Sequence, residues 1–183
     1  MIRRFFNFIK RLFVRTPAVE LPEDIPPVVV GEQFKNLILG KIKDATDQEV
    51  VMIKKAFAFL TEVYSSHFFR EEILDANFTN TMGLSNYEIF QRLTTSEITI
   101  NVEMFTGTWR QNKVYHTVGY DDGDEYVHAN RYFVQDPITM MSLMAHETAH
   151  ALGFHHDSAS EYTSVPYMLN AITEKIAKEL KLG

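Results

Sequence analysis

Four of the seven histidines in this 183-residue chain fall within eleven residues, in the stretch HETAHALGFHH. His146 and His150 are four residues apart, so on a helix they stack one turn above the other. Two imidazoles in that arrangement can supply two of the four tetrahedral positions around a zinc ion. Gly153 then allows the chain to reverse, and His156 can return as a third ligand. The adjacent His155 is expected to point elsewhere on the turn.

Glu147 directly follows the first of these histidines. On a helix it lies about 100° around from His146, so it is better placed to contact a zinc-bound water than to bind the ion. A glutamate inside the apolar stretch MMSLMAHETAHAL is costly to bury unless it has a role there. A buried helix whose histidines only form hydrogen bonds is the alternative, and it leaves this glutamate unexplained.

The sequence has no cysteine, so any metal ion must be bound by histidine or by carboxylates. A second acidic group, DDGD at 121–124, could bind calcium, but a hairpin turn containing Asp-Gly explains it at less cost. The spacing of an EF-hand is also absent. We therefore predict one Zn²⁺ site, formed by His146, His150 and His156, with Glu147 as the catalytic base.

The complete pattern His-Glu-x-x-His-x-x-Gly-x-x-His resembles the long motif of the metzincin zinc endopeptidases, its fixed positions being His146, Glu147, His150, Gly153 and His156. The resemblance implies a Met-turn beneath the metal, for which the stretch SVPYMLN offers Met168. Asp157 is similar to the residue at that position in the adamalysin-like branch. The implied activity is zinc-dependent hydrolysis of peptide bonds in a protein or peptide substrate.

The helix that would carry the first two histidines is predicted over 136–152. Asp136 is suited to the N-cap position and Pro137 to the first helical position, while Gly153 is suited to the left-handed C-terminal cap. Most of the other residues of this helix are apolar, which predicts burial on most of its sides.

Other elements follow from capping and periodicity. Capping boxes at Thr46 with Glu49 and at Ser85 with Glu88 predict a backing helix of about twenty residues and a shorter helix. We expect strands at 28–30, 97–105, 113–120 and 125–129, and a closing amphipathic helix at 167–182. With the metzincin resemblance, these elements imply an α+β fold with a small twisted mixed sheet, a backing helix, an active-site helix and a C-terminal helix. The stretch 125–130 is the candidate edge strand for pairing with an extended substrate.

Charge divides the chain into parts. Residues 1–15 contain five basic residues and no acidic one, although the whole chain has a net charge of −6. The remainder is therefore acidic, and nucleic acid is not an expected partner. Four prolines in 16–27 indicate a linker, which leaves 28–183 as the zinc metallopeptidase domain.

The apolar residues at the N-terminus are interrupted by Lys10 and Arg11, too early for a signal peptide. No stretch reaches the length of a membrane span, so a cytoplasmic or membrane-peripheral setting is favoured. The basic, Phe-rich segment 1–15 is expected to contact a membrane surface or a partner, or to pack on its own domain.

Two alternatives to this function remain at this stage. The domain could bind zinc in a structural or binding role without hydrolysing a substrate, or it could hydrolyse peptidoglycan peptides.

The role of two tyrosines is also open. Tyr162 or Tyr167 could support the oxyanion that forms during hydrolysis, although packing is the more common role of such a tyrosine.

Overall fold

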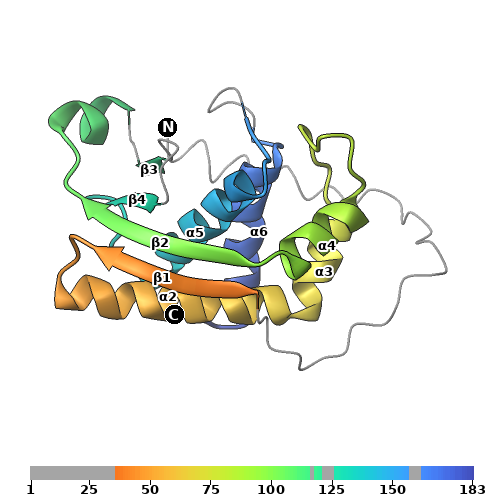
Figure 1. The fold of residues 1–183 in the computed structure, drawn as a ribbon, viewed down its shortest axis with the longest axis horizontal. Coiled ribbons are helices and arrows are strands. Elements are labelled where there is room, and N and C mark those ends of the chain that lie inside the picture. The colour runs from red at the N-terminus through yellow and green to blue at the C-terminus, as the bar shows by residue number, and fades with distance from the viewer. Residues whose placement is uncertain (1–35, 116–117, 121–125, 157–161) are drawn as a thin grey trace.

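The computed structural model describes residues 36–115, 118–120, 126–156 and 162–183. The predicted N-terminal segment, linker and first strand lie outside these residues, as do the acidic stretch 121–124 and Asp157. The described part is an α+β structure in which helices pack on a small mixed sheet (Figure 1). The expected fold class is thus confirmed at this level.

Within the described residues, the sheet has four strands in the order β1-β2-β4-β3. Three of them run parallel, and the two-residue β3 is antiparallel to β4; their bounds are β1 (Leu37–Lys43), β2 (Ile98–Phe105), β3 (Gly119–Tyr120) and β4 (Tyr126–Asn130). The strand predicted at 97–105 is confirmed as β2. Strand β1 was not predicted, because Gly40 and a register shift between Leu39 and Ile42 interrupt its alternation.

The strand predicted at 113–120 is wrong at its start, since 113–115 belong to the π-helical turn Gln111–Tyr115, and it is confirmed at its end, where Gly119–Tyr120 form β3. Residues 116–117 lie outside the described ranges. Side-chain amides hold the start of this region in a turn: the Gly107 amide donates to Asn130 Oδ1 at 3.2 Å, and Asn112 Nδ2 donates to the Gly107 carbonyl at 3.0 Å. The expected edge strand is also wrong. β4 lies between β2 and β3, which leaves β3 at that edge of the sheet.

Both capping boxes are confirmed, with α2 at Asp47–Ser65 and α4 at Asn86–Thr95. Between them, α3 (His67–Asp75) is a separate helix that the sequence did not predict. Ser66 causes the break, because its backbone is extended and its side chain accepts a hydrogen bond from the Phe69 amide.

The helices predicted at 136–152 and 167–182 are confirmed as α5 (Pro137–Ala151) and α6 (Val165–Glu179). Asp136 Oδ1 accepts hydrogen bonds from the amides of Ile138 and Thr139, each at 2.9 Å, and so caps α5 as predicted. In Figure 1, α2 runs along β1, while α5 and α6 lie behind β2.

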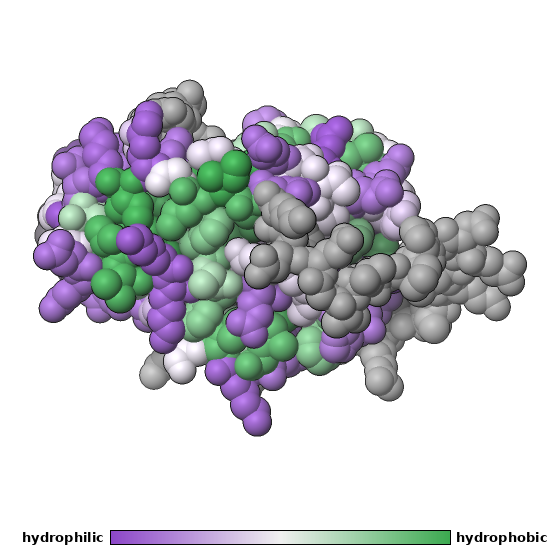
Figure 2. All heavy atoms as spheres, turned by 60° about the horizontal axis from the view of Figure 1, so that its bottom comes forward, coloured by the Kyte–Doolittle hydropathy of each residue, from purple (hydrophilic) through white to green (hydrophobic). Residues whose placement is uncertain are grey.

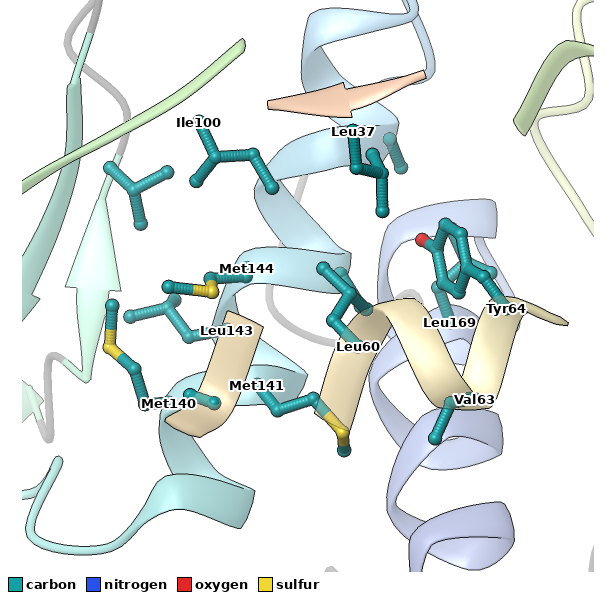
Figure 3. Close-up of a cluster of buried hydrophobic side chains, with 14 of the residues drawn as sticks. Leu37, Leu60, Val63, Tyr64, Ile100, Met140, Met141, Leu143, Met144 and Leu169 are labelled. Atoms are coloured by element: carbon teal, nitrogen blue, oxygen red, sulfur yellow. The ribbon is translucent and has the colours of Figure 1, made fainter. Parts of the chain in front are cut away.

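Helix α5 is buried on most of its surface, as its sequence predicted. Its apolar side chains lie against α2, β2 and α6, as Figure 3 shows for Met144 beside Leu60 and Ile100. The Met140, Met141 and Met144 side chains are 0 % exposed. Dense packing of this kind fixes the helix backbone, and with it the side chains at the C-terminal end of the helix.

The outer surface contains both apolar and hydrophilic side chains (Figure 2). Figure 2 brings the α2 side of the molecule forward and shows apolar patches broken by hydrophilic side chains. On α2 itself, Val51 is 67 % exposed. Within the described ranges, no helix combines the length and apolar character that a membrane crossing requires.

Candidate metal centre

The structure brings the three predicted ligands together. His146 and His150 project from the last turns of α5, and His156 follows the turn after that helix. The Nε2 atom of His146 lies 3.2 Å from His150 Nε2 and 3.3 Å from His156 Nε2. One potential ligand atom from each residue falls within 4.8 Å of the other two. Among the described residues this is the one cluster of three such side chains.

Gly153 makes this convergence possible. Its φ of +87° is the left-handed conformation that favours glycine, and its amide donates to the His150 carbonyl at 2.8 Å. The Phe154 amide then donates to the Ala149 carbonyl at 3.0 Å, and the Phe154 side chain is fully buried. The helix therefore ends sharply, and the chain turns back toward its own last turn.

Backbone carbonyls orient two of the three imidazoles. His150 Nδ1 lies 2.8 Å from the Phe154 carbonyl, which can only accept, so Nδ1 carries the proton and donates it. In the neutral ring the Nε2 lone pair then faces the other histidines. The Pro166 carbonyl, in the first turn of α6, accepts a hydrogen bond from the His146 ring.

The electrostatic setting favours neutral rings. Burial, together with the nearby His150 and His156, lowers the pKa of His146 to about 3, against the opposing effect of the hydrogen bond to the Pro166 carbonyl. At neutral pH the His146 ring is therefore uncharged, which is the form that binds a metal ion.

The measured separations fit a tetrahedral zinc site. Two nitrogens bound to one zinc ion at 2.0 to 2.1 Å lie about 3.3 to 3.4 Å apart in tetrahedral geometry. The 3.2 and 3.3 Å separations around His146 match that spacing. Three imidazole nitrogens of this kind would suit zinc among the common ions and would leave a fourth position for water or substrate.

Glu147 is 8 % exposed and lies on α5 beside the first ligand. The pKa of Tyr167 is raised, mainly by burial and to a lesser extent by the nearby Tyr162 and by the charge of Glu147. The Tyr167 ring centroid lies 4.9 Å from that of His146 and 4.6 Å from that of His156. The carboxyl group, the tyrosine and the three histidines thus form one site.

Of the two tyrosines considered from the sequence, Tyr167 is the one that packs on ligand rings. The Tyr162 ring lies behind it, 5.9 Å from the Tyr167 ring. His155 is exposed, and its ring lies over that of His150 at 5.9 Å, outside the cluster of three.

Met168 does not lie in a tight turn as expected. It belongs to α6, where its amide donates to the Ser164 carbonyl at 2.9 Å in a helical bond. The helix begins at Val165, where Pro166 in the first turn favours a helix start, whereas the Ser164 side chain makes no capping hydrogen bond. The Met168 side chain is partly buried against the core.

The carbonyls of Phe154 and Pro166 were not predicted as part of the site. They act through the backbone, so no side-chain type in the sequence could have indicated them. No protein-family model matches this chain, and neither curated proteins nor solved structures provided a similar one.

Proposed function

We propose that this protein is a zinc-dependent endopeptidase with a metzincin-like centre, in which His146, His150 and His156 bind the ion and Glu147 is the catalytic base. The observation that supports this most strongly is the convergence of three imidazoles at tetrahedral spacing beside a buried carboxyl group. A purely structural zinc site is usually closed by a fourth protein ligand. In the described residues the cluster contains three, which favours an open position for chemistry.

A bound zinc ion would supply a Lewis acid that polarises the scissile carbonyl and makes water acidic enough to deprotonate near neutral pH. The Glu147 carboxylate accepts the proton of the attacking water and later donates it to the leaving amine. The neutral His146 and the oriented His150 would each present an Nε2 lone pair to a bound ion. An extended peptide is expected to align along β3, the last strand on that side of the sheet.

The substitution Glu147→Gln tests this function. It preserves side-chain size and removes the base, so zinc content should stay at the wild-type level while hydrolysis falls by about 10² to 10⁴. Zinc is measured by elemental analysis, and cleavage is followed by mass spectrometry of a diverse peptide library with and without a chelator. A Gln variant that cleaves within a few-fold of wild type would refute the role of Glu147. A fully zinc-loaded wild type that cleaves no peptide would favour the binding-module or peptidoglycan alternatives.

A further inference from the structure

Arg92, on α4, contacts the turn that follows the active-site helix. Its Nη1 donates to the Leu152 carbonyl at 3.3 Å, and its guanidinium carbon lies 5.8 Å from the centroid of the Phe154 ring. These contacts join positions about sixty residues apart in the sequence. Arg92 is half-buried, so part of its charge is shielded from water.

The two contacts suit a guanidinium group. Leu152 is the C-cap of α5, where carbonyls lack helical partners and the helix dipole is negative. A planar cation can donate to such a carbonyl and also lie over an aromatic ring. Arg92 therefore holds the residues on both sides of Gly153, the residue at which the chain reverses.

The same turn orients a metal ligand. The backbone carbonyl of Phe154 accepts the hydrogen bond from His150 Nδ1. The side-chain ring of the same Phe154 lies beneath the Arg92 guanidinium group. A displacement of this turn would lengthen the 2.8 Å hydrogen bond and loosen the orientation of the His150 ring. His156 lies two residues beyond Phe154, so its position depends on the same turn.

We propose that Arg92 is a positioning residue of the metal centre, acting through Leu152 and Phe154 to fix His150 and His156. This inference rests on the metal-binding part of the proposed function and not on hydrolysis. A merely structural role for Arg92 would lower the stability of the fold and leave the metal affinity of folded molecules unchanged. Metal affinity therefore separates the two roles.

The experiment uses the full chain with Arg92→Ala, Arg92→Lys and the control Arg131→Ala. Arg131 is a matched residue, because it also donates to a backbone carbonyl, that of Asp44 at 2.7 Å, and it pairs with Glu49 at 3.1 Å, away from the metal centre. The dissociation constants for Zn²⁺ and Co²⁺ are measured by competition with a chelator. The visible spectrum of the Co²⁺ form reports the ligand geometry, and thermal melts of the metal-free proteins report stability.

We expect Arg92→Ala to weaken metal binding by about tenfold and to alter the Co²⁺ spectrum, as loss of groups that orient ligands usually does. Arg92→Lys should recover part of the affinity, because an ammonium still donates to the Leu152 carbonyl but does not lie flat on the ring. Arg131→Ala should lower stability while keeping the wild-type affinity and spectrum.

Wild-type affinity and spectrum in folded Arg92→Ala would overturn the inference and leave the proposed function standing. An equal loss of affinity in Arg131→Ala would also overturn it, since the effect would then follow general stability. If the wild-type protein binds neither ion, the proposed function itself fails.

Discussion

At the scale of single residues, the centre depends on three imidazoles whose ring nitrogens face one another at 3.2 to 3.3 Å. Neutral rings in that arrangement direct lone pairs at a shared point, which is unfavourable until a cation or a proton lies between them. Burial disfavours the proton on His146. A neutral His146 ring therefore suits the metal ion that we propose for this site.

The ligand assignment predicts different outcomes for two adjacent histidines. His156→Ala removes a ligand and should weaken Zn²⁺ binding by more than about a hundredfold, beyond the usual cost of losing an orienting group. His155→Ala removes an exposed ring outside the cluster and should leave binding within a few-fold of wild type. Chelator competition measures both constants. The reverse ranking would contradict the assignment of His156.

At the scale of elements, α5 and α6 together build the centre. Helix α5 supplies two ligands and the carboxyl group, and the first turn of α6 supplies Tyr167 and the Pro166 carbonyl. Farther along the same helix pair, Glu174 of α6 interacts with Ser142 of α5. The contact between α5 and α6 thus includes the Glu174 carboxyl group, whose protonation depends on pH.

Burial raises the pKa of Glu174, against the opposing effects of the Lys178 charge and the Ser142 hydrogen bond. Because the folded pKa exceeds the unfolded value of 4.5, the stability linked to this group is complete below pH 4.5 and is lost as pH rises through the folded pKa. Glu174→Gln should therefore stabilise the protein at neutral pH and have little effect at acidic pH.

Urea unfolding of the metal-free protein at several pH values measures this difference. Glu179→Gln, at an exposed position on α6, is the control and should leave the pH dependence of stability unchanged. A neutral-pH gain that persists undiminished at acidic pH would show that ionisation of Glu174 is not its cause.

At the scale of the whole molecule, one hydrophobic core holds α5 between α2, α6 and the sheet. The Leu60 side chain of α2 is 0 % exposed and lies near Met144 and Leu169 (Figure 3). The metal centre therefore sits at the end of a helix that the entire core supports.

Shortening a side chain in this core should lower the free energy of unfolding. Leu60→Ala leaves a cavity beside α5 and should lower the free energy of unfolding by about 2 to 5 kcal/mol. Val51→Ala, at a position 67 % exposed on the same helix, should change it by less than about 0.5 kcal/mol. Chemical denaturation measures both values, and similar losses in the two variants would contradict the described packing of α2.

The sequence by itself determined those features that depend on residues a few positions apart. The capping boxes at Thr46 and Ser85, the cap at Asp136 and the left-handed Gly153 each act within about one helical turn, so local spacing was sufficient to predict them. The three predicted ligands also come together, because two share a helix face and the third follows one glycine later.

Only the tertiary structure decided the features that depend on distant partners. β1 pairs with β2 across about sixty residues, and the start of the strand expected at 113–120 is replaced by a turn held by Asn112 and Asn130. Met168 lies within α6, which begins at Val165. Arg92 reaches the metal turn from another helix, and the Phe154 and Pro166 contributions are backbone carbonyls, which every residue possesses. Neither kind of contact has a pattern in sequence spacing, because the fold alone determines which distant groups meet.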